Sequence, residues 1–399
     1  MMLQKYWRII QDVRYQKMFD HLSGDCQDAY TRALSEGVSE HLLRWLLLHL
    51  DQRKINSEQF QSGCENSVYV TDLEMLFAEF SVSEKPLGAA REYSYPAAFM
   101  GACFGDIAGS VYESVMGLEE QDVAYRNCIT ADSGPTDDTI LSCATAIVLQ
   151  DLGSYQEYIE NRSLDITDFA VDGTYPFARN PFAEQYKTAI HTSYPHPGFG
   201  GAFYRWASSE SLKPYGSAGN GAAMRVSPIP EKYAKQEDVI PIAAMSAVAT
   251  HNHLEGVKGA IVTAMLIWMA YRGYSKEQIY GYAVQHYRGT QHTLPNTQKL
   301  KNFDMQELRW KPGYPLSSFS VPAAAICFHE SETFESAMDN VLSFSGDTDT
   351  IGAITGSIAG AYYGVSANAR EIVGRFNTDQ DFQKAYGILT LLSQNHSRL

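Results

Sequence analysis

Residues 345–364 read SGDTDTIGAITGSIAGAYYG and combine an acidic cluster with a run of small side chains. The cluster, residues 347–350, holds two aspartates and two threonines, and glycine or alanine then recurs through the rest of the stretch. If this run is helical, its small residues allow a neighbouring backbone to approach closely. The carboxylates then lie at a helix N-terminus, where the helix dipole favours negative charge. The stretch therefore predicts a closely packed helix that begins at an acidic site.

A second acidic cluster lies far upstream, where residues 136–139 read TDDT before the apolar run ILSCATAIVLQDL. One such cluster alone is more often an ordinary helix cap than a chemical site. Two of them favour a site. Two carboxylates about 4 Å apart repel by roughly 4 kcal/mol at an effective dielectric near 20. If the two clusters converge, their four carboxylates are therefore tolerable mainly when cations lie between them. Ligands that are all oxygen select hard ions such as magnesium, manganese or calcium.

The composition limits the classes of partner and compartment. Lysine and arginine total 31 against 46 aspartates and glutamates, a formal net charge of −15. No basic field is available for general binding to nucleic acid or to an anionic membrane. The six cysteines form no C-x-x-C pair, and the longest apolar run is shorter than the roughly 20 residues that cross a bilayer. The expectation is a cytoplasmic protein with reduced thiols and no membrane segment.

The chain divides into two predicted domains that differ in their sequence patterns. Residues 1–92 read as a helical N-terminal extension of short amphipathic segments with apolar groups such as Trp7, and residues 93–399 form the main domain. The polar segment 81–95 is interpreted as a linker between them. Two interpretations of the extension stay open: a partner-binding arm, or a layer that packs on the main domain.

The main domain consists of long alanine- and glycine-rich stretches with few credible strands, which predicts an all-α bundle. A D-x-D phosphatase motif of the haloacid-dehalogenase type is disfavoured, because Ile351 holds its fifth position and no strand–helix alternation surrounds it. Within residues 97–115 the only charges are Asp106 and Glu113. Asp106 is interpreted as either a buried clamp on a helix end or a chemical group.

Two glycine-dense loops, 198–201 and 216–221, expose backbone N–H groups of the kind that hold phosphate oxygens. Neither loop fits the Rossmann or the P-loop pattern. His251 and His253 follow without a cysteine or an H-E-x-x-H motif, which argues against zinc. A cap or core role and a ligand contact stay open for each histidine.

Six motifs occur in one order: GDIAGSVYE, TDDT, GFGGAF, GNGAAMR, ATHNHLEGVKGA and GDTDTIGAITGSIAGAYYG. With them the chain resembles the ADP-ribosylglycohydrolase family over roughly residues 96–366. That family includes dinitrogenase-reductase-activating glycohydrolases and ADP-ribosyl-acceptor hydrolases. The resemblance implies an orthogonal all-α helical bundle around a dinuclear metal site that holds two Mg²⁺, or Mn²⁺ in some members.

The resemblance also implies residue roles, carried over by motif. It implies that Glu113 is catalytic, by gating the site or by acid/base chemistry. The implied metal ligands are Thr136, Asp137, Asp138, Asp347, Asp349 and Thr350. The implied substrate-binding residues are Gly198, Gly200, Ser217, Gly219, Asn220, Gly221 and His251.

The function implied by the resemblance is metal-dependent hydrolysis of the glycosidic bond between ADP-ribose and a modified protein side chain. Arginine is favoured as the modified residue over serine or another acceptor, and the reaction reverses mono-ADP-ribosylation. The alternative is an immunity protein, or antitoxin, whose N-terminal extension blocks an ADP-ribosyltransferase toxin, with hydrolysis secondary.

Overall fold

The computed structural model describes residues 19–35, 57, 79–113, 123–157, 180–287, 316–343 and 346–396. Within these ranges the fold is all-α, as predicted, and the only strand-like pairings are two isolated bridges. None of the described helices is both long enough and apolar enough to span a membrane. In chain order the helices are α3 (Gly24–Ser35), α7 (Ala97–Gly109), η2 (Tyr125–Asn127), α8 (Asp137–Leu149), α10 (Pro181–Thr188), η5 (Ala189–His191), α11 (Gly201–Ala207), η6 (Asn220–Ala222), α12 (Pro228–Lys232), α13 (Gln236–Val248), α14 (Leu254–Tyr271), α15 (Lys276–His286), α18 (Ser317–His329), α19 (Phe334–Leu342), α20 (Thr348–Tyr363), α21 (Ala367–Phe376) and α22 (Gln380–His396).

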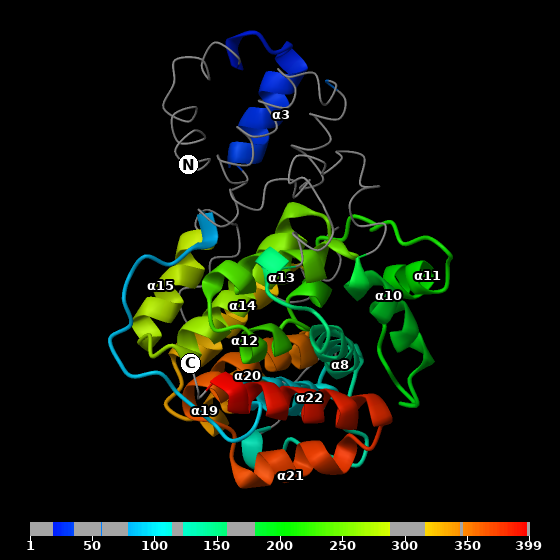
Figure 1. Ribbon diagram of the computed structural model, residues 1–399, viewed down its shortest axis with the longest axis vertical. Helices are drawn as coiled ribbons and strands as arrows, with labels where there is room; N and C mark the ends of the chain where they lie inside the picture. The colour runs from blue at the N-terminus through cyan, green and yellow to red at the C-terminus, as the bar shows by residue number, and fades with distance from the viewer. Residues whose placement is uncertain are drawn as a thin grey trace.

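Helix α20 lies in the interior of the main body (Figure 1) and is buried from Thr348 to Ala361. It packs against α7, α14, α18 and α19. A helix that is surrounded in this way has no solvent face, so its sequence is apolar or small all round rather than amphipathic. The run of small residues within 345–364 is therefore the centre of the core.

Helices α7 and α20 run antiparallel with their backbones in contact. Gly101 lies against Gly356, and Gly105 lies against Gly352. A Cβ atom placed on Gly352 would be 2.5 Å from the carbonyl oxygen of Gly105, so no side chain fits between the two helices. The close backbone approach that the small residues predict is present, and its partner is the GDIAGSVYE helix.

The N-terminus of α7 is closed by a side chain from another helix. Pro96 at the N-cap position supplies no side-chain hydrogen bond. Instead, Glu231 of α12 accepts hydrogen bonds from the backbone N–H of Ala98 at 2.8 Å and of Phe99 at 3.2 Å. The Tyr271 hydroxyl donates to the same Glu231 oxygen at 2.6 Å. This buried carboxylate satisfies the free N–H groups of the helix start and fixes α7 against α12 and α14.

Residues 81–95, interpreted from the sequence as a linker, are bound to the helical body. The Gly88 N–H donates to the Gly273 carbonyl at 2.9 Å, and the Arg91 N–H donates to the Tyr271 carbonyl at 2.7 Å. Directly before this segment, Phe80 is buried and stacks on His286 of α15 with ring centres 4.6 Å apart.

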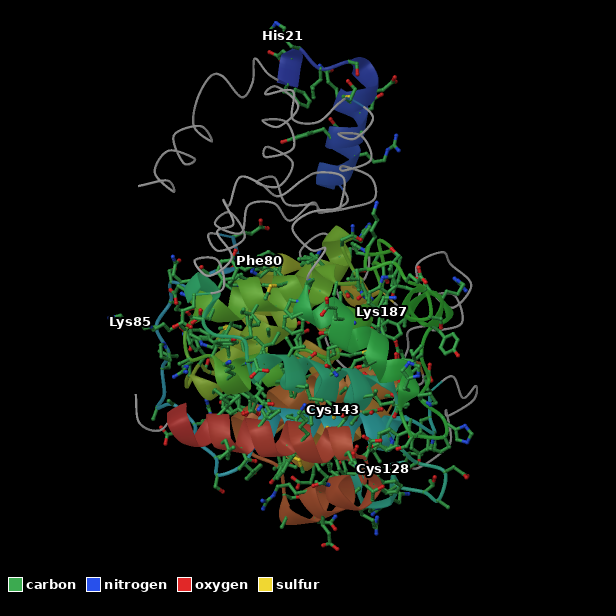
Figure 2. The ribbon with its side chains drawn as sticks, turned by 45° about the vertical axis from the view of Figure 1, so that its right-hand side comes forward. His21, Phe80, Lys85, Cys128, Cys143 and Lys187 are labelled. Atoms are coloured by element: carbon green, nitrogen blue, oxygen red, sulfur yellow. The ribbon has the colours of Figure 1, made fainter. Side chains whose placement is uncertain are left out.

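The first described helix of the extension lies away from this body. Helix α3 lies at one end of the molecule, apart from the other described helices (Figure 1). The side-chain view places His21 at that end and Phe80 at the edge of the body (Figure 2). Trp7 and most of the extension lie outside the described residues, and the division at residue 92 stays a prediction.

Five cysteines lie in the described residues, and all of them are buried free thiols: Cys26, Cys103, Cys128, Cys143 and Cys327. Figure 2 labels Cys128 and Cys143 within the helical body. These thiols fill core volume, as the sequence predicts, because each behaves as a small apolar side chain. Cys64 lies outside the described residues.

The contact between α7 and α20 predicts that Gly352→Ala destabilises the protein strongly. The added methyl group meets backbone atoms, which cannot rotate away, and overpacking of this kind costs about 3 kcal/mol. Urea-induced unfolding followed by circular dichroism measures the loss. The matched control is Gly374→Ala in α21, where an added Cβ has no atom within 4 Å. That variant is expected to gain up to about 1 kcal/mol, because alanine favours a helix over glycine. Equal stabilities for the two variants would contradict the packing described.

Candidate metal and catalytic site

The N-termini of α8 and α20 face each other and bring the two acidic clusters together. Thr136 is the N-cap of α8, and Asp347 holds the N-cap position of α20. The Thr350 hydroxyl donates to Oδ2 of Asp138 at 3.4 Å, so side chains of the two clusters are in contact. Both helix dipoles direct their positive ends at this point, which partly offsets the repulsion among the carboxylates.

Asp106 of α7 fixes the start of α8. Its carboxylate is fully buried and accepts hydrogen bonds from the Thr136 N–H at 3.0 Å, the Thr136 hydroxyl at 2.7 Å and the Thr139 N–H at 3.1 Å. The structure thus shows the helix clamp that is one of the two interpretations of Asp106. Because the clamp comes from α7, the same helix that contacts α20, the positions of α8 and α20 are coupled.

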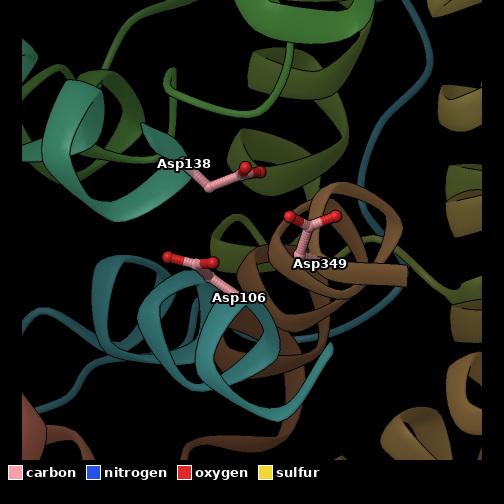
Figure 3. Close-up of side chains that lie close together, drawn as sticks. All are labelled: Asp106, Asp138 and Asp349. Atoms are coloured by element: carbon pink, nitrogen blue, oxygen red, sulfur yellow. The ribbon is translucent and has the colours of Figure 1, made fainter. Parts of the chain in front are cut away.

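The carboxylates form two groups that share one member. One oxygen each from Asp106, Asp138 and Asp349 lie within 4.8 Å of one another, and the same holds for Glu113, Asp347 and Asp349. Figure 3 shows the first three side chains, which come from α7, α8 and α20 and face a common space. Two adjoining oxygen-rich positions with a shared carboxylate suit one cation or a close pair.

Glu113 lies at the exposed edge of this arrangement, four residues after the end of α7. Its backbone pairs with that of Gly346 in an isolated bridge. Gly346 has a φ angle of 148°, a value that side-chain-bearing residues avoid, so glycine permits the turn directly before Asp347. The edge position leaves the Glu113 carboxylate open to solvent, unlike the buried aspartates beneath it.

Asn220, which the sequence assigns to the substrate, contacts a predicted metal ligand. Its amide Nδ2 donates to Oδ2 of Asp347 at 2.5 Å and to the Ser320 hydroxyl at 2.8 Å. Ser320 lies on α18. Ser320 is not among the predicted site residues, because a lone serine in an apolar helix carries no motif that could have identified it. These bonds fix one face of Asp347 from the glycine loop.

The remaining predicted substrate residues lie in or against the two glycine loops. Gly198, with a φ angle of 73°, lies beside Asp137, since a Cβ on it would be 3.4 Å from Oδ1 of Asp137. Asp137 belongs to neither carboxylate group. Gly221 lies against the His251 ring. Gly200 is the exposed N-cap of α11. The Ser217 hydroxyl accepts a hydrogen bond from the Gly219 N–H at 3.1 Å, and the Gly219 carbonyl accepts one from the Ser317 hydroxyl at 2.8 Å.

The sequence model of the family described as ADP-ribosylglycohydrolase matches residues 89–395, most of the chain and all of the site above. The chain belongs to this family. It is 29% identical over 341 residues to ADP-ribosylhydrolase ARH3 of Bos taurus, and the match covers 70% of this chain and 87% of the relative. It is 28% identical over 170 residues to ADP-ribosylarginine hydrolase Tri1 of Pseudomonas putida, at 42% of this chain and 44% of the relative. A solved structure described as an ADP-ribosylglycohydrolase-related protein complex is 24% identical, with a TM-score of 0.49, and the match covers 75% of this chain and 97% of that one.

In this glycosidase the buried carboxylates resist ionisation. Burial raises the pKa of Asp138 and Asp349, and repulsion from neighbouring aspartates raises it further. The pKa of Asp137 is raised to about 8 by burial and by repulsion from Asp106, Asp347 and Glu113. Burial also raises the pKa of Asp106, against the opposing effect of its hydrogen bonds from Thr136 and Thr139. Burial is the main cause of each shift, and repulsion between carboxylates adds to it for Asp137, Asp138 and Asp349.

The donor set fits a hard divalent cation. Oδ1 of Asp138 is buried and has no hydrogen-bond partner among the described residues. A buried, unpaired carboxylate oxygen is costly, and a bound cation removes that cost. The groups around it offer only oxygen atoms, which suits magnesium or manganese rather than zinc. The acidic residues that the family resemblance implies can therefore hold metal.

The raised pKa of Asp137 predicts that added magnesium stabilises this ADP-ribosylglycohydrolase more as the pH rises. Without a cation, the folded state keeps a proton that the unfolded chain releases near pH 3.9, so the stabilisation by that proton is lost as the pH passes about 8. A cation replaces the proton. The difference in Tm between samples with magnesium and with chelator is expected to grow between about pH 5.5 and 8.

The control for this measurement is Asp138→Asn, which removes one charge from the first group and is expected to reduce the difference at every pH. A difference in Tm that stays constant from acid to neutral pH would contradict the assignment of these carboxylates to a cation site.

Proposed function

We propose that this protein hydrolyses the glycosidic bond between ADP-ribose and a modified protein side chain, and that it uses two divalent cations, magnesium or manganese. The observation that carries the proposal is the pair of carboxylate groups that share Asp349, in a member of the ADP-ribosylglycohydrolase family. The relative from Bos taurus, an ADP-ribosylhydrolase by name, supports the substrate class. A protein bearing ADP-ribose is then the partner that the site meets.

The residues that would hold the ions are the six predicted ligands, with Asp106 setting the position of Thr136 and Asn220 setting that of Asp347. When bound, the ions supply positive charge that attracts the ribose hydroxyls and lowers the pKa of water. The chain's own carboxylates would also stabilise the positive charge that develops on the anomeric carbon.

Glu113 is the residue we propose for proton transfer. Water adds its hydroxyl to the anomeric carbon, the bond to the protein side chain breaks, and the second proton of water goes to the released side-chain atom. An exposed carboxylate beside Asp347 and Asp349 is placed to take that proton and to deliver it. The N–H groups of the loops at Gly198 and Gly219 would hold the diphosphate.

For the linkage, we propose arginine, which the name of the Pseudomonas putida relative supports over part of the chain. The test compares release of ADP-ribose from an arginine-linked and a serine-linked peptide, with magnesium present. The arginine-linked peptide is expected to react faster, and Asp347→Ala is expected to abolish release while circular dichroism stays unchanged. Faster release from the serine-linked peptide would show that the protein prefers a serine linkage over an arginine linkage. No release from either peptide by the unaltered protein would overturn the proposed function.

A second prediction concerns Glu113→Gln, which keeps the size of the side chain and removes its capacity to transfer a proton. Turnover is expected to fall by about 10²-fold. Magnesium affinity, measured by calorimetry, is expected to change less than it does in Asp349→Asn, since Asp349 belongs to both carboxylate groups. Glu332→Gln, an exposed change outside both groups, is the control. Normal turnover in Glu113→Gln would assign Glu113 a structural role.

The alternative function, a transferase-binding arm of an immunity protein, depends on the N-terminal extension. Deletion of residues 1–78 tests it better than removal of the whole predicted extension, because Phe80 is part of the core. We expect the shortened protein to hydrolyse normally and to lose capture of an ADP-ribosyltransferase in a pull-down, whereas Asp347→Ala keeps capture. Equal capture by full-length and shortened protein would remove the arm hypothesis.

A further inference from the structure

Arg225 is fully buried, and its positive charge has no ion-pair partner in the part of the chain that the structure describes. Its guanidinium lies over the Tyr186 ring at 4.0 Å. One nitrogen donates to the Ser246 carbonyl at 3.0 Å and to the Thr250 hydroxyl at 2.8 Å. The other two nitrogens have no hydrogen-bond partner among the described atoms. Packing alone does not account for so costly a group, because an apolar side chain would fill the same space.

The bond from Arg225 determines what the Thr250 hydroxyl can do. Oγ1 of Thr250 also lies 2.7 Å from Nδ1 of His251. Arginine is a permanent donor, so Thr250 accepts from it and has its single proton left to donate. Nδ1 of His251 is the acceptor in reach. If Nδ1 carried the proton instead, the hydroxyl proton of a fully buried threonine would lack an acceptor within the described residues.

The proton of the neutral His251 ring therefore lies on Nε2, and this edge of the ring faces the glycine loop. A Cβ placed on Gly221 would be 3.1 Å from both Nε2 and Cε1. Gly221 follows Asn220, which holds Asp347. The neighbouring His253 differs, since its Nδ1 accepts the Glu255 N–H at 3.1 Å as an ordinary cap of α14.

We propose that Arg225 and Thr250 are positioning residues, which hold His251 as a neutral imidazole that offers its Nε2–H to the bound ligand beside Gly221. The identity of that ligand as ADP-ribose rests on the proposed function. Burial lowers the pKa of His251, and the charges of Arg225 and His253 lower it further, so the ring is neutral near pH 7. The ring thus acts as a fixed donor, with a tautomer set from the side opposite the ligand.

The first experiment reads the tautomer directly. Histidine labelled with ¹⁵N gives nitrogen shifts and long-range proton couplings that distinguish an Nε2–H ring from an Nδ1–H ring, and His251→Gln identifies the signal. We expect the Nε2–H form in the full-length protein and in Thr250→Ser, which keeps the hydroxyl. We expect a mixture of forms in Thr250→Val, which removes it. The control is Thr263→Val on α14, a buried threonine whose hydroxyl has no described partner.

The second experiment measures the Kd for free ADP-ribose, and KM against kcat for the hydrolysed peptide. Thr250→Val is expected to weaken both Kd and KM about tenfold with kcat within about twofold, because a positioning effect on binding leaves the reacting atoms in place. Thr250→Ser is expected to restore both values, and Thr263→Val to leave them unchanged.

An Nδ1–H signal for His251 in the full-length protein would overturn the proposal. So would a Thr250→Val protein with unchanged tautomer and unchanged Kd. If Thr250→Val does not fold, the spectra of the full-length protein and of Thr250→Ser still decide. A protein that binds no ADP-ribose would overturn the proposed function and the ligand assigned to His251, whereas the tautomer would still decide whether Arg225 and Thr250 set the ring.

Discussion

Gly105 and Gly352 bring the backbones of α7 and α20 into direct contact, and the position of each acidic side chain depends on that contact. Asp106 follows Gly105, so it lies next to the first turn of α20 while it clamps the start of α8. A side chain between the two helices would move the α7 carboxylate away from the α20 carboxylates by a large fraction of a metal–ligand distance. Glycine is therefore required at positions that perform no chemistry themselves.

The site concentrates negative charge in a protein that is already strongly acidic. Three features of the described structure make this tolerable. The N-termini of α8 and α20 supply partial positive charge. Backbone N–H groups and hydroxyls donate hydrogen bonds to Asp106 and Asp138. The remaining unpaired oxygen, Oδ1 of Asp138, can bind a cation. Arg225 shows the opposite case, a buried positive charge kept away from the carboxylates and used to orient a neutral ring.

Much of this architecture can be predicted from the sequence, because it depends on local composition. Small residues at helical spacing predict the close approach of α20 to a neighbour, and the two acidic clusters predict a shared site. The clamp by Asp106, the bond from Asn220 to Asp347 and the binding of residues 81–95 to the body are not predictable in the same way. Each joins segments that are distant in the chain, and a single sequence does not say which distant polar groups meet. The polar character of 81–95 predicts a linker, because some of its bonds to the body, such as those of the Gly88 and Arg91 N–H groups, use backbone atoms that leave no mark on residue type.

The separation between α7 and α20 along the chain also has a consequence for biosynthesis. The ribosome makes the helix with Gly105 long before its partner α20, so the glycine face of α7 waits for that partner during synthesis. Contacts of such long range form late and slowly. The acidic site cannot assemble until α20 has emerged, and a chain terminated before that helix lacks half of the carboxylates. Only a chain translated past α20 can form the complete site.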